Sequence, residues 1–321
     1  MIYLNKEDIL KSITLDEFMD AVEEAYKIYA DKSFNMPDRI QVENDDLTAL
    51  YMPCFTKKAF GTKILTVAPN NAKINKPVID GVMLVNDIET GELVCMMDGK
   101  TLTAARTGAV GGVGVRYITS EYVKTLGLIG TGVQGFYQVL YACKARNIKT
   151  VYLYNRTKEK AIKLQEELKK ELENVDVIVV NSSLELLKNS EVIITATTSY
   201  QPVIDNQKEL LKGKHIIAIG SYKPDMRELP DALFEVVDKV IVDTDFAKEE
   251  SGDLYLPIKN NLIKSEDIEN MGDFIRDNKE FDVNNKTTLY KSVGMGLFDM
   301  VVANKIYKKA IEKGIGQNIN L

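Results

Sequence analysis

Tryptophan is absent from the 321-residue sequence, and histidine and cysteine are scarce, with one and three residues. The cysteines Cys54, Cys95 and Cys143 are scattered, odd in number and not in metal-ligand spacing. We therefore expect no disulfide framework, and thiols that stay reduced as in a cytoplasm. The single histidine, His215, starts an apolar segment. We expect it to be structural, which disfavours a histidine proton relay and a histidine-rich metal site.

Long apolar runs and basic patches are absent too. No run approaches the ~20 apolar residues that span a bilayer. Acidic residues near the start stand where the apolar core of an export signal would lie. A net charge of −6, with no basic patch among aromatic residues, disfavours nucleic acid as a partner. We expect a soluble cytoplasmic protein with no membrane partner, no nucleic-acid partner and no metal.

The remaining composition is that of a globular protein, with 45% apolar and 27% charged residues. The length suggests two domains, because one domain usually has ~100–200 residues. An acidic stretch from Asp243 to Asp253 is interpreted as a solvated loop, because its spacing does not demand a cation.

The first third of the chain changes from helical to strand periodicity. Between Asp8 and Ala30 apolar residues recur at helical spacing, with Thr14 placed as an N-cap and Glu17 three residues later. From residue 39 to residue 94 short β-branched and apolar segments are separated by proline, glycine and turn residues. This pattern predicts one or two helices followed by an antiparallel or mixed sheet.

The next predicted helix begins after Asp98-Gly99, and its part from Thr103 to Arg116 is dense in small residues. Each interior glycine costs a helix ~1 kcal/mol relative to alanine. The cluster therefore indicates that another group approaches the backbone closely. That group is either a ligand or a neighbouring helix or sheet.

From Val123 onward, predicted strands and helices alternate as in βαβ units. We expect a Rossmann-type, doubly wound parallel sheet (α/β) and a smaller mixed-sheet α+β domain for substrate binding and dimerisation. The expected domains are residues 1–115 with about 296–321, and residues 116–295. A last helix over residues 293–313 can return to the first domain. The expected strands of the parallel sheet are 125–129, 150–154, 175–180, 192–196, 215–219 and 240–242.

A glycine loop, Gly130-Thr131-Gly132-Val133-Gln134-Gly135, carries the strongest chemical signal. It follows the apolar segment 126–129 and opens a predicted helix, which is the context that a dinucleotide-binding loop requires. The first glycine permits the tight turn, the second lets a pyrophosphate approach, and the third lets the helix lie close to the sheet. The alternative is a glycine-rich turn without a ligand.

The end of the second predicted strand bears on which dinucleotide binds. An acid at this place would hold the ribose 2′-hydroxyl of NAD, but the chain has Asn155, Arg156 and Thr157 there. A guanidinium and a hydroxyl suit a 2′-phosphate. We therefore expect NADP to be preferred and NAD to be possible, although Arg156 can also be a solvated loop residue.

Several motifs together resemble the ornithine cyclodeaminase/mu-crystallin family, in the same order and over nearly the whole chain. The run Asp98-Gly99-x-x-Leu102-Thr103-x-x-Arg106-Thr107 is the most specific. The others are Gly61-x-Lys63, Pro69-x-Asn71, the loop 130–135 and Lys223-Pro224-Asp225-Met226-Arg227-Glu228-Leu229.

The resemblance implies a homodimer whose mixed-sheet domain supplies both the substrate site and the dimer contact. Members of the family act on the C–N bond at the α-carbon of amino acids, as cyclodeaminases, alanine dehydrogenases or ketimine reductases.

Lys63 is the candidate catalytic residue. Period-two alternation places it with Leu65 and Val67 on an apolar strand face, and burial lowers the pKa of a lysine. It can then polarise, or give a proton to, a carbonyl or imine. The resemblance implies the same role, while a lysine reaching solvent from a strand edge is the alternative.

Two arginines are candidate substrate ligands. The guanidinium fork of Arg106, on the small-residue helix, suits a carboxylate or phosphate. The resemblance implies that Arg39 holds the substrate carboxylate, whereas its own pattern, with Gln41 and Glu43, favours a surface residue. We also expect cofactor contacts from Thr107, Thr197 and Ser221.

One departure from the family bears on the reaction. Cyclodeaminases and alanine dehydrogenases of the family carry an aspartate shortly after the glycine that ends the fifth Rossmann strand, and the corresponding place here falls at about Tyr222. Deamination needs a base for the α-amine, whereas reduction of a preformed imine does not.

We therefore expect an NAD(P)-dependent enzyme that transfers hydride to a small imino acid, as an amino-acid dehydrogenase or ketimine reductase does. The first alternative is cyclodeamination of ornithine to proline with catalytic NAD. The second is a non-catalytic, crystallin-like NADP-binding protein.

Overall fold

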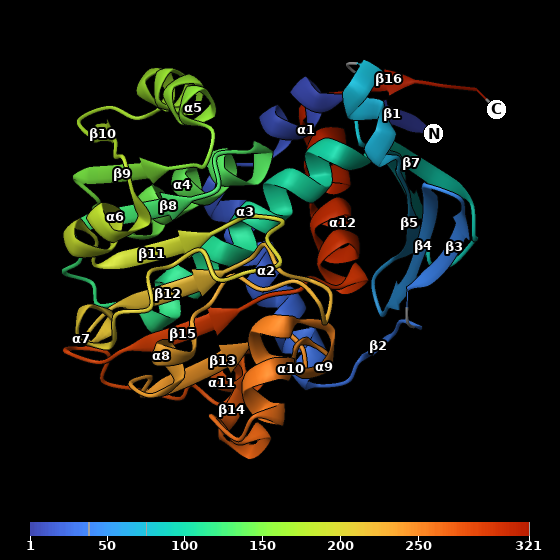
Figure 1. The fold of residues 1–321 in the computed structure, drawn as a ribbon. Coiled ribbons are helices and arrows are strands. Elements are labelled where there is room, and N and C mark those ends of the chain that lie inside the picture. The colour runs from blue at the N-terminus through green and yellow to red at the C-terminus, as the bar shows by residue number, and fades with distance from the viewer. Residues whose placement is uncertain (38, 75, 321) are drawn as a thin grey trace. The chain divides into compact units, whose positions relative to one another are not determined.

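The computed structural model describes residues 1–37, 39–74 and 76–320 (Figure 1). They form two compact units: unit 1 is Met1–Arg106 with Met295–Leu321, and unit 2 is Thr107–Gly294. The units follow the same order along the chain as the two expected domains, whose limits remain a prediction. Among the described residues, no helix is long and apolar enough to cross a membrane.

Unit 1 contains the predicted N-terminal helices and the last long helix. The helices are α1 (Lys6–Ser12), α2 (Leu15–Ala30) and α12 (Gly296–Lys313). The predicted cap of α2 is confirmed, because the Thr14 hydroxyl accepts from the Glu17 N–H and the Glu17 carboxylate accepts from the Thr14 N–H. α12 packs on α2, with the rings of Tyr26 and Phe298 edge to face.

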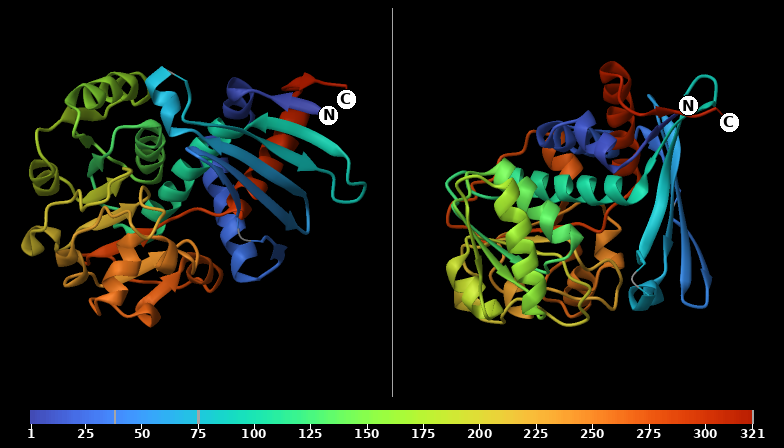
Figure 2. Two further views of the ribbon diagram at one scale, coloured as in Figure 1. Left: turned by 45° about the vertical axis from the view of Figure 1, so that its right-hand side comes forward. Right: turned by 90° about the horizontal axis from the view of Figure 1, so that it is seen from above.

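A mixed sheet completes unit 1, as predicted (Figure 2). Its order is β16-β1-β7-β6-β5-β4-β2, with β3 beside β4; β1 and β7 are parallel and the other neighbours antiparallel. The 3₁₀ helix η1 (Pro69–Ile74) lies between β5 and β6. The strands are β1 (Ile2–Leu4), β2 (Phe34–Asn35), β3 (Ile40–Asn44), β4 (Leu47–Thr56), β5 (Phe60–Val67), β6 (Ile79–Asn86), β7 (Leu93–Asp98) and β16 (Gln317–Asn318).

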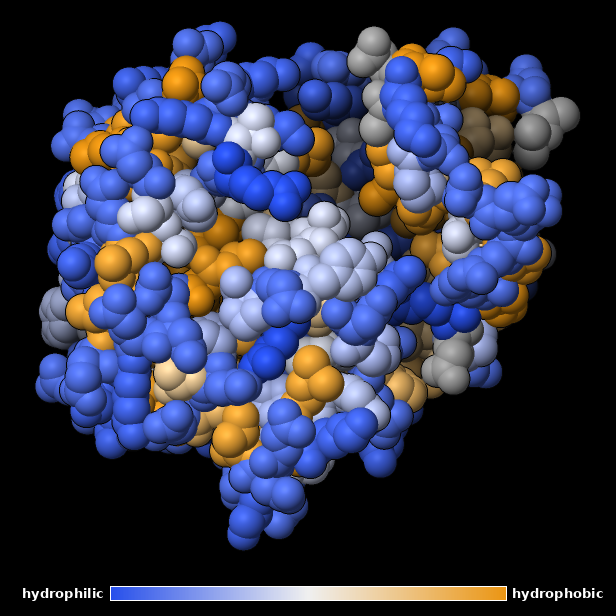
Figure 3. Space-filling model, in the orientation of Figure 1, coloured by the Kyte–Doolittle hydropathy of each residue, from blue (hydrophilic) through white to orange (hydrophobic). Residues whose placement is uncertain are grey.

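The two faces of this sheet differ. Residues Gly61, Lys63 and Leu65 of β5 are buried on the face that packs against α12. The opposite face leaves large apolar side chains 40 to 54% exposed, and Figure 3 shows hydrophobic surface over these strands. Those side chains are Ile40, Val42, Leu47, Tyr51 and Phe55, which we call the apolar sheet face.

Unit 2 holds the predicted parallel sheet, in the order β10-β9-β8-β11-β12-β15-β13-β14. All of its neighbouring strands are parallel. β14 and β15 were not predicted; β15 is a fully buried four-residue strand between β12 and β13. The strands are β8 (Thr125–Ile129), β9 (Thr150–Tyr154), β10 (Asp176–Val179), β11 (Val192–Thr195), β12 (His215–Ala218), β13 (Lys239–Val242), β14 (Ile268–Asn270) and β15 (Thr288–Lys291).

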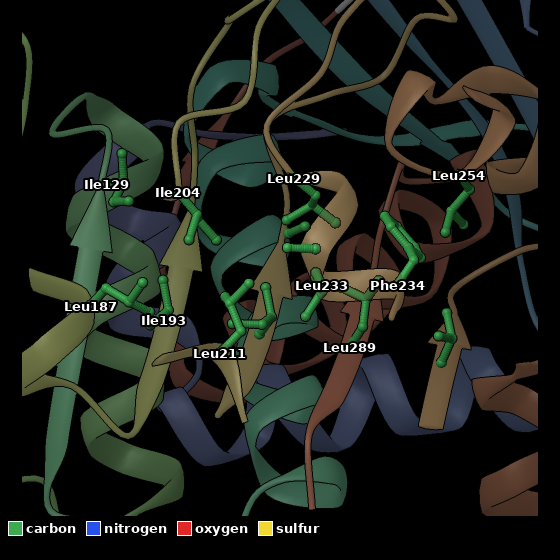
Figure 4. Packing of buried hydrophobic residues seen from close by; sticks show 14 of the residues in the cluster. Ile129, Leu187, Ile193, Ile204, Leu211, Leu229, Leu233, Phe234, Leu254 and Leu289 are labelled. Atoms are coloured by element: carbon green, nitrogen blue, oxygen red, sulfur yellow. The ribbon is translucent and has the colours of Figure 1, made fainter. Parts of the chain in front are cut away.

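Short helices cover one face of the parallel sheet and bury a hydrophobic cluster there. Figure 4 shows this cluster, to which α6 (Ser183–Asn189) contributes Leu187 and α8 (Asp231–Phe234) contributes Leu233. The remaining helices of unit 2 are α4 (Val133–Ala145), α5 (Lys158–Glu171), α7 (Lys208–Leu211), α9 (Ala247–Glu250), α10 (Gly252–Lys259), η2 (Ser265–Asp267) and α11 (Met271–Arg276).

The small residues of α3 (Gly99–Ile118) serve packing. A Cβ on Gly108 would lie 2.6 Å from the ring of Tyr141 in α4, and one on Gly114 would lie 2.5 Å from the ring of Tyr290 in β15. Of the two readings of this glycine cluster, close packing against a helix and a strand is therefore what the structure shows within unit 2.

His215 is structural, as predicted. Its imidazole is buried, accepts the backbone N–H of Ser120 and hydrogen-bonds the hydroxyl of Thr288. Burial lowers its pKa to about 4, so the ring stays neutral at physiological pH.

Candidate active site

Lys63 lies in the middle of the mixed sheet, on the buried face of β5. Its neighbours in the register are Met52 of β4 and Met83 of β6, and only 1% of its surface is exposed. The alternation that placed Lys63 with Leu65 is confirmed by the burial of both side chains. A lysine buried in this way needs a counterion.

The counterion is Asp299 of α12. Its Oδ2 accepts from Lys63 Nζ at 2.7 Å, and its Oδ1 accepts from Arg106 Nε at 2.9 Å. All three side chains are buried. We call Lys63, Arg106 and Asp299 the lysine–aspartate–arginine cluster.

The sequence analysis missed Asp299. The only local signal for it is an acid within an otherwise apolar helical run, between Phe298 and Met300. A charge in such a position is rarely buried without a partner. The partners could not be identified from the run itself, because Lys63 is 236 positions away.

Burial and neighbouring charges set the protonation of this cluster. Burial, with help from the charge of Arg106, lowers the pKa of Lys63 to about 8, although Asp299 opposes the shift. Burial would raise the pKa of Asp299, but Arg106 and Lys63 hold it below its usual range. With Lys63 protonated, two positive charges face one negative charge, so the cluster suits an added anion.

Two further residues of unit 1 act on the cluster. Arg39 precedes β3, is half-buried, and its charge lowers the pKa of Lys63. The structure therefore brings Arg39 within electrostatic reach of Lys63, as the expected role requires. Burial, and then the charge of Asp299, raise the pKa of the Cys54 thiol to about 12, which makes it a poor nucleophile.

Gly61 explains how α12 comes close enough to β5. A Cβ at this position would lie 2.1 Å from the carbonyl oxygen of Leu84 and 3.2 Å from the sulfur of Met300, which follows Asp299 in α12. A larger residue would therefore push against both the next strand and the helix that carries the counterion.

In unit 2 the glycine loop has the predicted position between β8 and α4. Gly130 has φ +104°, and a Cβ there would lie 2.5 Å from the carbonyl oxygen of Ala196. A Cβ on Gly135 would lie 2.4 Å from the carbonyl oxygen of Gly130. Gly132 is the N-cap of α4 and faces open space, since a Cβ there would meet nothing within 4 Å.

Unsatisfied polar groups show that this loop fits a dinucleotide. Thr131 Oγ1 and Gln134 Oε1 are buried and have no hydrogen-bond partner among the described residues. The N-cap of α4 also makes no side-chain capping bond. Free N–H groups at a helix N-terminus, with open space before them, bind phosphate oxygens. Val133, which follows the N-cap Gly132, is exposed, so this part of the loop is open to solvent.

The residues after β9 form the second part of the expected cofactor site. Asn155 Oδ1 accepts the N–H of Thr131 at 3.3 Å, and its Nδ2 donates to the carbonyl of Thr157 at 2.9 Å. Arg156 and Thr157 are exposed, and Thr157 is the N-cap of α5 without a side-chain capping bond. The structure therefore joins Asn155 to the glycine loop and leaves a guanidinium and a hydroxyl open beside it.

The other expected cofactor contacts have mixed surroundings. Thr197 follows β11 and is half-buried, and the carbonyl of Thr107 accepts from Gln138 Nε2 at 2.9 Å. Ser221 is fully buried, and its hydroxyl bonds the carbonyl of Met226 and the hydroxyl of Ser251. Because its hydroxyl is already hydrogen-bonded, Ser221 could contact a ligand only through its backbone.

The solvated-loop interpretation of residues 243–253 is wrong at both ends. Asp243 directly follows β13 and is fully buried. Its carboxylate accepts from the Ser292 hydroxyl and from the backbone N–H groups of Val293 and Gly294. Asp253 lies buried in α10 and pairs with Lys291 at 3.0 Å. Local polarity suggested solvent, but the partners lie at the end of β15 and directly after it, and the sequence analysis did not find this strand.

Comparison with known proteins decides the family. A profile of the ornithine cyclodeaminase/mu-crystallin family matches residues 1–314. The chain belongs to this family. It is 34% identical over 328 residues to a Δ1-pyrroline-2-carboxylate reductase of Bacillus cereus, covering 99% of each chain.

Two solved structures are similar over their whole length. One is the Δ1-pyrroline-2-carboxylate reductase of Thermococcus litoralis in complex with NADH and L-proline, with TM-score 0.91, 31% identity and coverage of 99% of this chain and 100% of that one. The other is an archaeal alanine dehydrogenase dimer with bound NAD, with TM-score 0.90, 27% identity and coverage of 100% and 99%. The family resemblance and the fold class expected from the sequence are both confirmed.

The shared counterion leads to a prediction about stability. Replacing Asp299 with asparagine leaves two buried cations without an anion, so the Asp299→Asn variant should lose ~3–5 kcal/mol of unfolding free energy. Urea denaturation measures this. Glu24→Gln is the matched control, because Glu24 and Lys58 are also 2.7 Å apart but exposed; it should lose less than ~1 kcal/mol. Equal losses in both variants would show that burial does not set the strength of the pair.

Proposed function

We propose that this protein is an NAD(P)H-dependent reductase of a small cyclic imino acid, of the Δ1-pyrroline-2-carboxylate type. The observation that carries the proposal is the lysine–aspartate–arginine cluster, which offers a buried proton donor beside a guanidinium suited to a carboxylate. The similarity to reductases of this substrate, over 99% of the chain, supports the choice.

The reaction adds a hydride and a proton across the C=N bond. The glycine loop of unit 2 would hold NAD(P)H, which would supply the hydride for the imine carbon. The ammonium of Lys63 gives a proton to the imine nitrogen and becomes a neutral amine, which takes a proton from solvent before the next cycle. Arg106 and Arg39 hold the substrate carboxylate, and Asp299 keeps Lys63 and Arg106 in place.

Cyclodeamination of ornithine is the weaker alternative. It needs a base for the α-amine, and the position that carries the acid in cyclodeaminases of the family falls at about Tyr222, which is 42% exposed here. A non-catalytic binding role is also weaker, because such a role gives no reason to bury a charged lysine with a counterion. We place the reaction in the cytoplasm, which the three free cysteines support.

The proton donor predicts the pH dependence. Because reduction needs protonated Lys63, kcat/KM for imino acid reduction should fall as the pH rises through about 8, the pKa of this lysine. The reverse oxidation of the cyclic amino acid needs the neutral amine and should rise through the same range. Absorbance of NAD(P)H at 340 nm follows both directions, with Δ1-pyrroline-2-carboxylate and L-proline as substrates.

The Lys63→Met variant tests whether Lys63 is the proton donor or serves only the stability of the fold. It should lose at least a hundredfold in kcat, as expected for a removed general acid worth ~10²–10⁴, and should still bind the dinucleotide. Full turnover by Lys63→Met would remove the lysine from the mechanism. Proline formed from ornithine without net NAD(P)H change would instead support the cyclodeaminase alternative.

We further propose that NADP(H) is preferred over NAD(H), which is also accepted. Arg156 and Thr157 stand exposed after β9, and no carboxylate is there to hold a 2′-hydroxyl or to repel a 2′-phosphate. The solved relatives contain NADH or NAD, so the preference rests on these residues alone.

Removal of the guanidinium tests the preference. Arg156→Ala should raise KM for NADPH about tenfold, since a charge-assisted hydrogen bond contributes ~1.5–3 kcal/mol, and should leave KM for NADH within about twofold. Initial rates with each dinucleotide measure this. Lys160→Ala, which removes an exposed cation from the first turn of the following helix α5, is the control. A wild-type enzyme that favours NADH, or a variant that loses both dinucleotides equally, would overturn the assignment.

We propose that two copies of the chain form a homodimer through the apolar sheet face. Large apolar side chains are rarely left together on a free surface, and this face presents five of them on adjacent strands. The archaeal relative is a dimer.

Light scattering after size-exclusion chromatography should therefore give about twice the 36.0 kDa chain mass. A charge on the apolar sheet face should break the dimer, because it cannot be buried there without a partner. The Val42→Glu, Phe55→Glu variant should elute at the mass of one chain. Ile162→Glu, at an exposed apolar position on α5, should remain dimeric. A wild-type protein of single-chain mass would contradict the proposal.

A further inference from the structure

A buried acid that the proposed reaction does not use lies in the segment 223–229. Glu228 is fully buried, next to Leu229, which lies in the hydrophobic cluster of unit 2 (Figure 4). We propose that Glu228 is a positioning residue for the dinucleotide: its carboxylate fixes the two loops that follow β11 and β12. This inference rests on the proposed use of NAD(P)H.

The carboxylate is saturated by donors from those loops. Oε1 accepts the backbone N–H of Thr197 at 2.6 Å, and Oε2 accepts the backbone N–H of Gly220 at 2.8 Å. Oε2 also accepts the N–H of Ser221 at 3.2 Å and the hydroxyl of Thr195 at 3.0 Å. Two of these residues, Thr197 and Ser221, are expected cofactor contacts. Glu228 therefore accepts N–H groups from both loops with one carboxylate.

The position of these loops in the sheet gives the contacts a functional meaning. In open parallel sheets, ligands bind at the carboxyl ends of the strands, where the strand order reverses. Here the order reverses between β8 and β11. Thr197 follows β11, and its Cγ2 would lie 2.8 Å from a Cβ on Gly130 of the glycine loop. Glu228 thus supports the residue that packs against the first glycine of the dinucleotide loop.

The two loops approach so closely that only glycine fits between them. A Cβ on Gly220 would lie 2.1 Å from the carbonyl oxygen of Thr197 and 2.6 Å from Oε1 of Glu228. A shift of either loop would open this contact. The carboxylate is therefore placed where it sets the distance between the two strand ends.

A second acid and a lysine hold Glu228 itself. Asp253 Oδ1 accepts the backbone N–H groups of Glu228 and Leu229 at 2.7 and 2.9 Å, and Asp253 Oδ2 accepts from Lys291 Nζ at 3.0 Å. Burial and the charge of Asp253 raise the pKa of Glu228, while Lys291 and the donors from Thr197 oppose this. Three of the four donors to Glu228 are backbone N–H groups, which can donate but cannot accept, so the geometry favours the ionised form.

The test replaces the carboxylate by an amide of the same shape. In Glu228→Gln the amide NH₂ points a donor at backbone N–H groups, which should loosen one of the two loops. We expect the dissociation constant of NADPH, measured by quenching of protein tyrosine fluorescence, to rise at least tenfold. KM for Δ1-pyrroline-2-carboxylate, which unit 1 binds, should change less than twofold. A purely structural role would weaken both to the same extent.

Glu191→Gln is the matched control. Glu191 also accepts two backbone N–H groups and a threonine hydroxyl, from Lys124 and Thr125, but at the amino end of β8. It should bind NADPH as the wild type does. Thr195→Val, which removes one donor to Glu228 and leaves the carboxylate, should raise the dissociation constant two- to fivefold and serves as the readout if Glu228→Gln does not fold.

The outcomes separate this inference from the proposed function. If the wild type binds neither NADPH nor NADH, the proposed function fails. If the wild type binds and Glu228→Gln, or Thr195→Val in its place, binds with an unchanged dissociation constant, the positioning role fails while the function stands. A tenfold loss in Glu191→Gln as well would show that any carboxylate supporting this sheet has the same effect, and would equally overturn the role.

Discussion

The carboxylate of Asp299 is the contact on which unit 1 depends. One oxygen holds the ammonium of Lys63 and the other holds the guanidinium of Arg106, and all three groups are out of water. Neither cation could be buried without it. The same contact joins the centre of β5, the last long helix and the first half of α3, so three elements of this unit are held by one side chain.

Unit 2 shows how close backbone contacts prepare a ligand site. Gly130 and Gly135 let β8, the loop and α4 lie so near one another that side chains have no room, while Gly132 leaves space open at the N-terminus of α4. In the same loop, the buried side-chain oxygens of Thr131 and Gln134 have no hydrogen-bond partner among the described residues. A diphosphate fits this site, because its oxygens accept from free N–H groups and from the Thr131 hydroxyl, and its bulk fits where no Cβ is present.

Buried acids have different tasks in the two units. Asp299 balances two cations and so raises the pKa of Lys63, whereas Glu228 accepts backbone N–H groups from two loops. The difference follows from the donors. The donors to Asp299 are cationic side chains, so the contact balances their charge, whereas the donors to Glu228 are mostly main-chain N–H groups, so the contact fixes the distance between two loops. Asp253 combines both, since it accepts from two N–H groups and from Lys291.

Local patterns in the sequence were enough to determine much of this protein. Helical spacing and a capping box located α2, alternation placed Lys63 on a buried face, and the glycine loop after an apolar strand located the junction of β8 and α4. Each of these features depends on residues within a few positions of one another. Strand β15 could not be found in this way. Its residues Thr-Leu-Tyr-Lys lack the pair of β-branched apolar residues present in the equally short β11, β12 and β13, and β12 and β13 enclose it only after the chain has folded.

Only the tertiary structure decided which charges are buried and with what. Asp299 and Lys63 are 236 positions apart, and Asp253 was read as solvated because its partner Lys291 lies 38 positions away on the unpredicted strand. The same holds for the small residues of α3, whose neighbours proved to be tyrosines of α4 and β15. A charge or a glycine in a sequence shows only that a partner or a close approach is needed. The partner itself is determined by the packing of elements that are distant along the chain.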